Sequence, residues 1–134
     1  MIIPNKFLKL DYNPTYDILF VEWPNMHDYT LTEVTYIIDE VIDAVRSYDI
    51  KRILTDTRQS KVTVPMEEYA KIINELALQL AKTRLQKFAK LQTSDADRET
   101  VSSNAAALVI GSIAYRSFSS TEEAVTWLTA GEGV

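Results

Sequence analysis

The polar side chains best suited to chemistry lie together in one short segment, Asp56-Thr57-Arg58-Gln59-Ser60. The carboxylate of Asp56 and the guanidinium of Arg58 could order a loop, hold a ligand or dock a charged group of a partner. An internal ion pair or a turn cap would account for the same two residues. Thr57 and Ser60 carry hydroxyls that modification could charge. We therefore predict a binding role for Asp56, Thr57, Arg58 and Ser60.

His27 is the one histidine of the chain and the natural choice for a general base. A catalytic base needs a second group that orients it, and Asp28 is adjacent only in sequence. Hydrolase or transferase chemistry at Asp56 and His27 would require the fold to bring them together. We predict no catalytic residue and a non-enzymatic protein, with His27 and Trp23 as further binding residues.

The chain contains few residues that could bind a metal or a cofactor. The chain has no cysteine and a single histidine, which excludes disulfides, thiolate zinc sites and iron–sulfur clusters. A carboxylate site is the remaining option, and the spacing of Asp and Glu shows no cluster of that kind. We expect no metal and no cofactor.

Charge and hydropathy argue against nucleic acids and membranes as binding partners. The net charge is −5, which repels nucleic-acid phosphates and anionic lipid surfaces. The basic residues Lys82, Arg84, Lys87 and Lys90 lack interleaved aromatics and are interpreted as a solvated turn. No run approaches the ~18 apolar residues of a membrane helix, and the N-terminus lacks the apolar region of a signal peptide. We expect a cytoplasmic protein without nucleic-acid partners or a membrane span.

Hydrophobic periodicity predicts the elements that must position these residues. Thr30 and Glu33 form a capping-box pattern before a strongly amphipathic helix, and Ser120 and Glu123 repeat it. The expected order is a hairpin (Phe7–Tyr12 and Ile18–Trp23), a helix after Thr30, a strand at Arg52–Asp56, a helix after Pro65, a strand at Lys87–Thr93, a helix at Ala96–Ile110 ended by Gly111, a strand at Ile113–Phe118, and a helix from Ser120 to Gly131.

This order predicts a single α/β domain over residues 1–134. The sheet is expected to be mixed and mostly parallel, with five strands, an antiparallel N-terminal edge hairpin and four helices. Strands separated by helices run parallel through right-handed crossovers. Polar residues on several strands predict that one sheet face is incompletely covered, which offers a solvated edge, a groove or a homodimer interface.

The loops at the carboxyl ends of parallel strands are where ligands bind in open α/β sheets. Here they are Trp23–Tyr29, Asp56–Ser60, Thr93–Asp95 and Ser117–Thr121, and we expect them along one rim. Helix N-termini there favour anions, although Ser, Thr and Asp also serve as ordinary caps.

Aromatic residues offer a second kind of site. Trp23, Tyr29, Tyr69, Tyr115 and Trp127 could line an apolar pocket for a small ligand. Core packing would explain the same residues.

Four pieces in chain order carry a family resemblance. They are Leu10-Asp11-Tyr12 with Ile18–Pro24, then Ile53–Arg58, then Phe118-Ser119-Ser120, and finally Glu122–Leu128. Together they resemble the SpoIIAA-like group of STAS/SEC14-type domains. The resemblance implies a β-α superhelical fold and relatives that are regulatory binding modules or lipid carriers. In anti-sigma-antagonist relatives a phosphorylatable serine follows an aspartate as Asp-Ser-Ser-Gly, whereas here the segment Asp56–Ser60 has no glycine.

Two functions follow as expectations. The first is a regulatory or protein-interaction module that acts through the strand-end rim, switched by modification of Thr57 or Ser60. The alternative is a carrier of a small amphipathic or lipid-like ligand.

Overall fold

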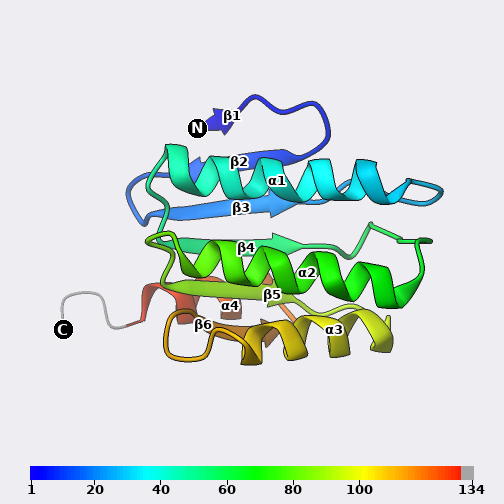
Figure 1. Cartoon of the computed structure of the whole chain (residues 1–134). Coiled ribbons are helices and arrows are strands. Elements are labelled where there is room, and N and C mark those ends of the chain that lie inside the picture. Colours follow the sequence, from blue (N-terminus) through cyan, green and yellow to red (C-terminus); the bar gives the residue numbers. More distant parts are fainter. Residues whose placement is uncertain (131–134) are drawn as a thin grey trace.

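A computed structural model describes residues 1–130 and places six strands side by side in chain order (Figure 1). The strands are β1 (Ile2–Ile3), β2 (Lys9–Asn13), β3 (Ile18–Glu22), β4 (Arg52–Asp56), β5 (Lys87–Leu91) and β6 (Ala114–Phe118). The helices are α1 (Leu31–Ser47), α2 (Met66–Ala81), α3 (Ala96–Ala107) and α4 (Thr121–Thr129). The α/β class and the mixed, mostly parallel sheet predicted from the sequence are confirmed.

The sheet changes direction only at its N-terminal side. Strands β1, β2 and β3 pair antiparallel, whereas β3 to β6 pair parallel. The prediction of five strands omitted β1, so the first hairpin strand β2 is not the edge. β1 is held because the backbone of Met1 accepts a hydrogen bond from the Tyr12 N–H at 2.8 Å and its ammonium group donates to the Tyr12 carbonyl, also at 2.8 Å.

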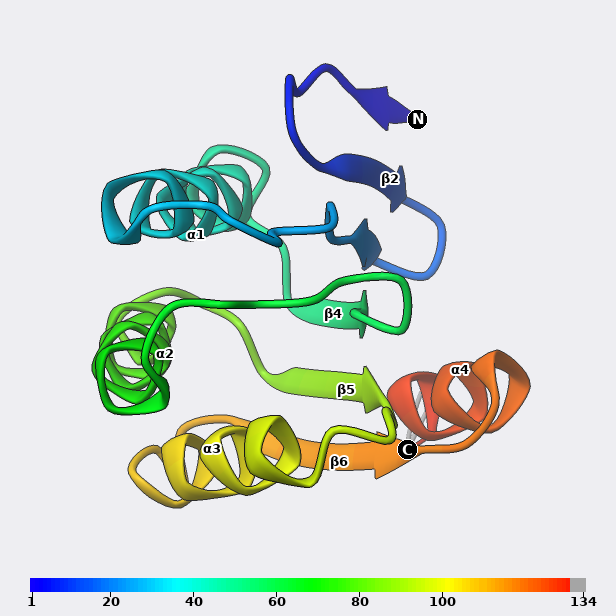
Figure 2. The ribbon, with the colours of Figure 1, turned by 90° about the vertical axis from the view of Figure 1, so that its right-hand side faces the viewer.

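Three helices lie on one face of the sheet and one on the other (Figure 2). Helices α1, α2 and α3 each connect two neighbouring parallel strands and pack on the same face. After β6 no further strand follows within residues 1–130, and α4 packs against the opposite face, on β4, β5 and β6. Two apolar clusters result, a large one under α1–α3 and a smaller one under α4.

The helix boundaries follow from local caps. The Thr30–Glu33 capping box is formed in full, and the hydroxyl of Ser120 accepts the Glu123 N–H. The carboxylate of Asp95 caps α3, and Pro65 is the N-cap of α2 rather than its first residue. α3 ends at Ala107, earlier than expected, and Gly111 (φ +93°) lies in the turn beyond it. Gly131, the predicted end of α4, lies outside the described residues.

The α4 face is only partly covered, as the sequence predicts. A shallow cleft with a volume of about 190 Å³ lies beside α4, lined by residues that include Asp11, Phe20, Glu22 and Asp56. No helix within residues 1–130 is both long and apolar enough to cross a membrane.

Candidate ligand-binding site

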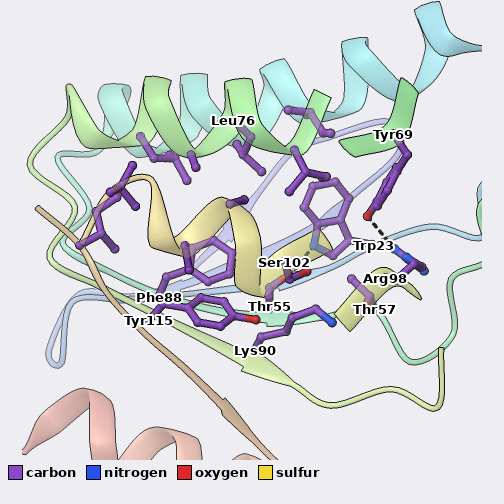
Figure 3. A pocket seen from close by; sticks show the side chains of 18 of the residues that line it. Trp23, Thr55, Thr57, Tyr69, Leu76, Phe88, Lys90, Arg98, Ser102 and Tyr115 are labelled. Atoms are coloured by element: carbon purple, nitrogen blue, oxygen red, sulfur yellow. Dashed lines mark hydrogen bonds between the residues drawn. The ribbon is translucent and has the colours of Figure 1, made fainter. Parts of the chain in front are cut away.

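Two hollows meet on the side of the sheet that α1–α3 cover. We call the first the interior cavity. It has a volume of about 80 Å³ and lies between the sheet and helices α2 and α3, with Trp23, Ile73, Leu76, Phe88, Ala105 and Tyr115 among its walls (Figure 3). We call the second the rim cleft. It has a volume of about 720 Å³, and His27, Arg58, Ser60, Lys61, Thr93 and Asp95 are among its walls. Thr57 and Arg98 line both.

The alternation of side chains along the strands builds the floor of the interior cavity. Thr55 and Thr57 of the β4 segment face α2 and α3, as do Phe88 and Lys90 of β5. Leu54, which directly precedes Thr55, and Ala89, which lies between Phe88 and Lys90, belong to the cluster under α4. Residues two positions apart on a strand share one face. The cavity therefore receives every second residue of the central strands.

Trp23 is fixed at the wall of the cavity by one hydrogen bond. Its indole N–H donates to the hydroxyl of Thr55, and both side chains are buried. A buried indole N–H left unpaired would be costly, so Thr55 satisfies it. Trp23, predicted as a binding residue, is therefore a wall of the cavity with no polar group left to offer a ligand.

Lys90 is buried but paired. Its ammonium group donates to the carboxylate of Glu99, which also accepts a hydrogen bond from the Thr93 hydroxyl at 3.0 Å. The ion pair neutralises Lys90 within the core. The expectation that Lys90 belongs to a solvated turn is wrong, because β5 turns it toward α3 rather than toward water.

Arg98 is buried without a carboxylate partner. Only 3% of the residue is exposed, and its guanidinium donates to the Ser60 carbonyl at 2.8 Å and to the Tyr69 hydroxyl at 3.3 Å. The Tyr69 ring also lies 5.4 Å from the guanidinium carbon. Within residues 1–130 no carboxylate forms an ion pair with Arg98. Figure 3 shows Arg98, Tyr69 and Thr57 at one end of the cavity, away from Phe88.

Two buried hydroxyls beside Arg98 also lack partners. Thr57 Oγ1 and Ser60 Oγ are shielded from solvent and make no hydrogen bond with the described residues. The two residues belong to one tight turn, because the Ser60 N–H donates to the Thr57 carbonyl at 3.0 Å. Buried polar groups are normally hydrogen-bonded, so two orphaned hydroxyls beside one unpaired cation are unusual.

Asp56 and Arg58 form an internal ion pair, which was one of the interpretations of these residues from the sequence. Arg58 Nε and Nη2 each donate to the Asp56 carboxylate at 3.0 Å, and the Arg58 backbone N–H donates to it at 3.0 Å. These hydrogen bonds from Arg58 lower the pKa of the Asp56 carboxyl below its ordinary value. The pair orders the start of the turn that carries Thr57 and Ser60.

The loops after β3 and β4 are joined at the mouth of the rim cleft. Met26 and Val62 form a parallel bridge, and the Met26 N–H donates to the Lys61 carbonyl at 2.9 Å. The Asn25 side chain accepts the Lys61 N–H at 3.1 Å. These contacts hold the outer wall of the cleft against the sheet end.

The predicted binding residues divide between the two faces of the sheet. His27, Thr57, Arg58 and Ser60 do share the rim cleft. Asp56 lines the cleft beside α4 instead, together with Thr121. The loops follow the carboxyl ends of β3 to β6, which run parallel, but the Asp56 side chain points to the opposite face from the rim cleft, because neighbouring residues along a strand point to opposite faces.

The acid–base pair of Asp56 and His27 is not assembled. His27 is mostly exposed, and its Nε2 lies 3.4 Å from the carboxylate of Asp28. Asp56 is engaged by Arg58. No group of three or more His, Cys, Asp or Glu side chains within residues 1–130 is arranged to hold a metal ion.

The sequence analysis did not predict three features of the site. They are the burial of Arg98, the burial of Lys90, and the contact of Tyr69 with Arg98. A signal for Arg98 existed. It precedes Val101 by three residues and Ala105 by seven, so it falls on the apolar stripe by which α3 packs on the core.

Comparison of the chain with protein-family models, with curated proteins and with solved structures found no match. The resemblance to the SpoIIAA-like group therefore stays a prediction.

Proposed function

We propose that this chain is a non-enzymatic binding protein that holds a small amphipathic molecule in the interior cavity. The observation that carries the proposal is an apolar cavity inside the core that adjoins a polar cleft at Thr57 and Arg98, which line both. Protein cores are close-packed, so an apolar cavity beside buried charged groups is a suitable place for a small ligand.

The size of the cavity sets the size of the occupant. A water-sized group needs about 10–15 Å³ on this measure, so about 80 Å³ accommodates roughly five to eight such groups. An alkyl chain of about six carbons fits, whereas a long lipid chain would have to extend into the rim cleft.

1-Hexanol is a suitable probe because it has the expected size and no charge. We expect it to shift the backbone NMR signals of Ile73, Leu76 and Phe88 in a saturable way. In Ala105→Leu the larger side chain occupies the cavity, so these shifts should disappear. Ala107→Leu places the same side chain on the exposed face of the same helix and should leave them unchanged.

The absence of saturable shifts in the natural protein would refute the proposal. Should Ala105→Leu fail to fold, as judged by circular dichroism, Ala77→Leu supplies the same obstruction from α2, since Ala77 also lines the cavity. Binding that survives in a folded obstructed variant would equally refute it.

A protein-interaction module that acts through the rim cleft is the second proposed function. The observation that favours it is the gathering of Arg58, Lys61 and Arg98 in one cleft, opposed there by Asp95, in a chain of net charge −5. A cationic cleft suits an acidic partner segment. In this conformation the hydroxyls of Thr57 and Ser60 are buried, so a modifying enzyme would need the turn to open first.

A hexaglutamate peptide tests this second function. It should shift the NMR signals of residues 92–95, and the charge reversals Arg58→Glu and Lys61→Glu should abolish those shifts. Lys71→Glu, on the exposed side of α2, is the matched control. Equal binding by the cleft variants and the control would refute an interaction through the cleft.

A further inference from the structure

We propose that Arg98, Thr57 and Ser60 form the site for the anionic head of the bound molecule, and that this head is a carboxylate on a short alkyl chain. This inference rests on the proposed ligand-binding function and specifies the chemical class of the ligand.

The charge balance at the end of the cavity that adjoins the rim cleft is the first step. Two cations, Lys90 and Arg98, are buried there, and among residues 1–130 the one carboxylate that forms an ion pair with either of them is Glu99, which pairs with Lys90. The carboxylate of Asp95, on the rim, accepts the backbone N–H of Arg98 at 3.1 Å and caps the helix. One positive charge is therefore left over. Within the described part of the chain Arg98 is held by neutral groups alone, and a buried cation is stabilised further by an opposite charge, so the site favours an anion.

The unused hydrogen-bonding capacity is the second step. A guanidinium has five N–H donors, and the hydrogen bonds of Arg98 to Ser60 and Tyr69 use two of them. The hydroxyls of Thr57 and Ser60 add two further donors without a partner among residues 1–130. The three N–H groups left on Arg98 and the two hydroxyls make five donors, enough for the roughly four hydrogen bonds that a carboxylate can accept.

The position of these groups gives the third step. Thr57 and Arg98 line both the interior cavity and the rim cleft, so they stand at the passage between an apolar space and a polar one. An anion held there leaves its alkyl chain pointing to Phe88 and Leu76. A single leftover positive charge matches a carboxylate monoanion better than a phosphate dianion.

Three probes distinguish the parts of the ligand: hexanoate, 1-hexanol and inorganic phosphate. We expect hexanoate to bind at least tenfold more tightly than 1-hexanol, as measured by calorimetry, because charge-assisted hydrogen bonds contribute about 1.5 kcal/mol or more. Phosphate, which has no tail, should bind more weakly than hexanoate.

The variant Arg98→Gln should reduce hexanoate binding to the level of 1-hexanol and leave 1-hexanol binding unchanged. Arg84→Gln removes the same charge from an exposed position and should change neither. Thr57→Val keeps the charge of Arg98 and removes one donor. It should weaken hexanoate binding about tenfold, which provides an independent test if Arg98→Gln fails to fold.

Each outcome bears on a separate claim. Equal affinity for hexanoate and 1-hexanol would overturn the anion site and leave the proposed binding function standing. Failure of both to bind would overturn both claims. Phosphate binding as tight as that of hexanoate, and equally dependent on Arg98, would overturn the assignment to an alkyl carboxylate.

Discussion

Replacement of Thr57 by valine should make the ligand-free protein more stable. The change exchanges a hydroxyl for a methyl group of similar size. The Thr57 hydroxyl is buried and makes no hydrogen bond to the described residues, so the folded state bears the cost of removing it from water. That cost is about 1–3 kcal/mol for an unpaired buried polar group. Some relaxation reduces it, and we expect a gain in the free energy of unfolding of about 1 kcal/mol.

Thr55→Val is the matched control, because Thr55 lies in β4 two residues before Thr57 and lines the same cavity. The Thr55 hydroxyl is also buried, but it accepts the hydrogen bond of the Trp23 indole. Valine there leaves the indole N–H unpaired, so the free energy of unfolding should fall by about 2 kcal/mol. The same chemical change should thus have opposite signs at two neighbouring positions.

Urea titration of each variant gives the free energy of unfolding, and thermal melts give a second measurement. For a chain of 134 residues, the entropy of unfolding is about 0.28 kcal/mol/K, so Tm should rise by about 4 °C in Thr57→Val and fall by about 7 °C in Thr55→Val. A Thr57→Val variant destabilised by about 1 kcal/mol or more would show that the hydroxyl has a partner in solution. Thr57 would then not be available to bind an anion.

Two further changes test the electrostatic account. Asp17 accepts hydrogen bonds from the Tyr12 hydroxyl at 2.8 Å and from the Lys51 backbone and ammonium groups at 3.2 Å. Burial acts to raise the pKa of Asp17, but these bonds lower it overall, so the carboxylate stabilises the fold at neutral pH and loses that effect as the pH falls. Measured by urea unfolding, Asp17→Asn should cost about 1 kcal/mol at pH 7 and progressively less as the pH is lowered through the acidic range, and a cost that stays constant would contradict this. Glu99→Gln leaves Lys90 buried and unpaired and should cost about 3 kcal/mol, whereas adding Lys90→Met should restore most of it. A double variant no more stable than the single one would count against the pair.

The order and type of the elements were predictable because local signals determine them. The capping box at Thr30 and the apolar stripe of α1 specify that helix without reference to the rest of the chain. Short β-rich runs between amphipathic helices in turn specify a parallel sheet. β1 was not predictable in this way, because a pair of residues carries no periodicity and pairs only through its contacts with β2.

The candidate site was predictable at the level of the segment and not at the level of the side chain. The turn Asp56–Ser60 was identified correctly as lying at a strand end, yet Asp56 faces α4 while Thr57 faces α3. Arg98 was not predicted as a site residue, because a charged side chain is expected to be exposed unless an oppositely charged partner is evident. Its burial depends on how α3 packs against Tyr69 of α2, which sequence periodicity alone does not reveal.

The two tryptophans of the chain lie on opposite faces of the sheet. Trp23 forms a wall of the interior cavity, whereas Trp127 belongs to α4 and packs on Phe118, with its ring 5.1 Å from the Lys87 ammonium group. The two fluorophores of the chain are therefore in different surroundings, one at the cavity and one in the apolar cluster on the α4 face. With Trp127 replaced by phenylalanine, the tryptophan emission of the protein would come from Trp23 alone. Its wavelength of maximum emission would then report how far water reaches the cavity wall.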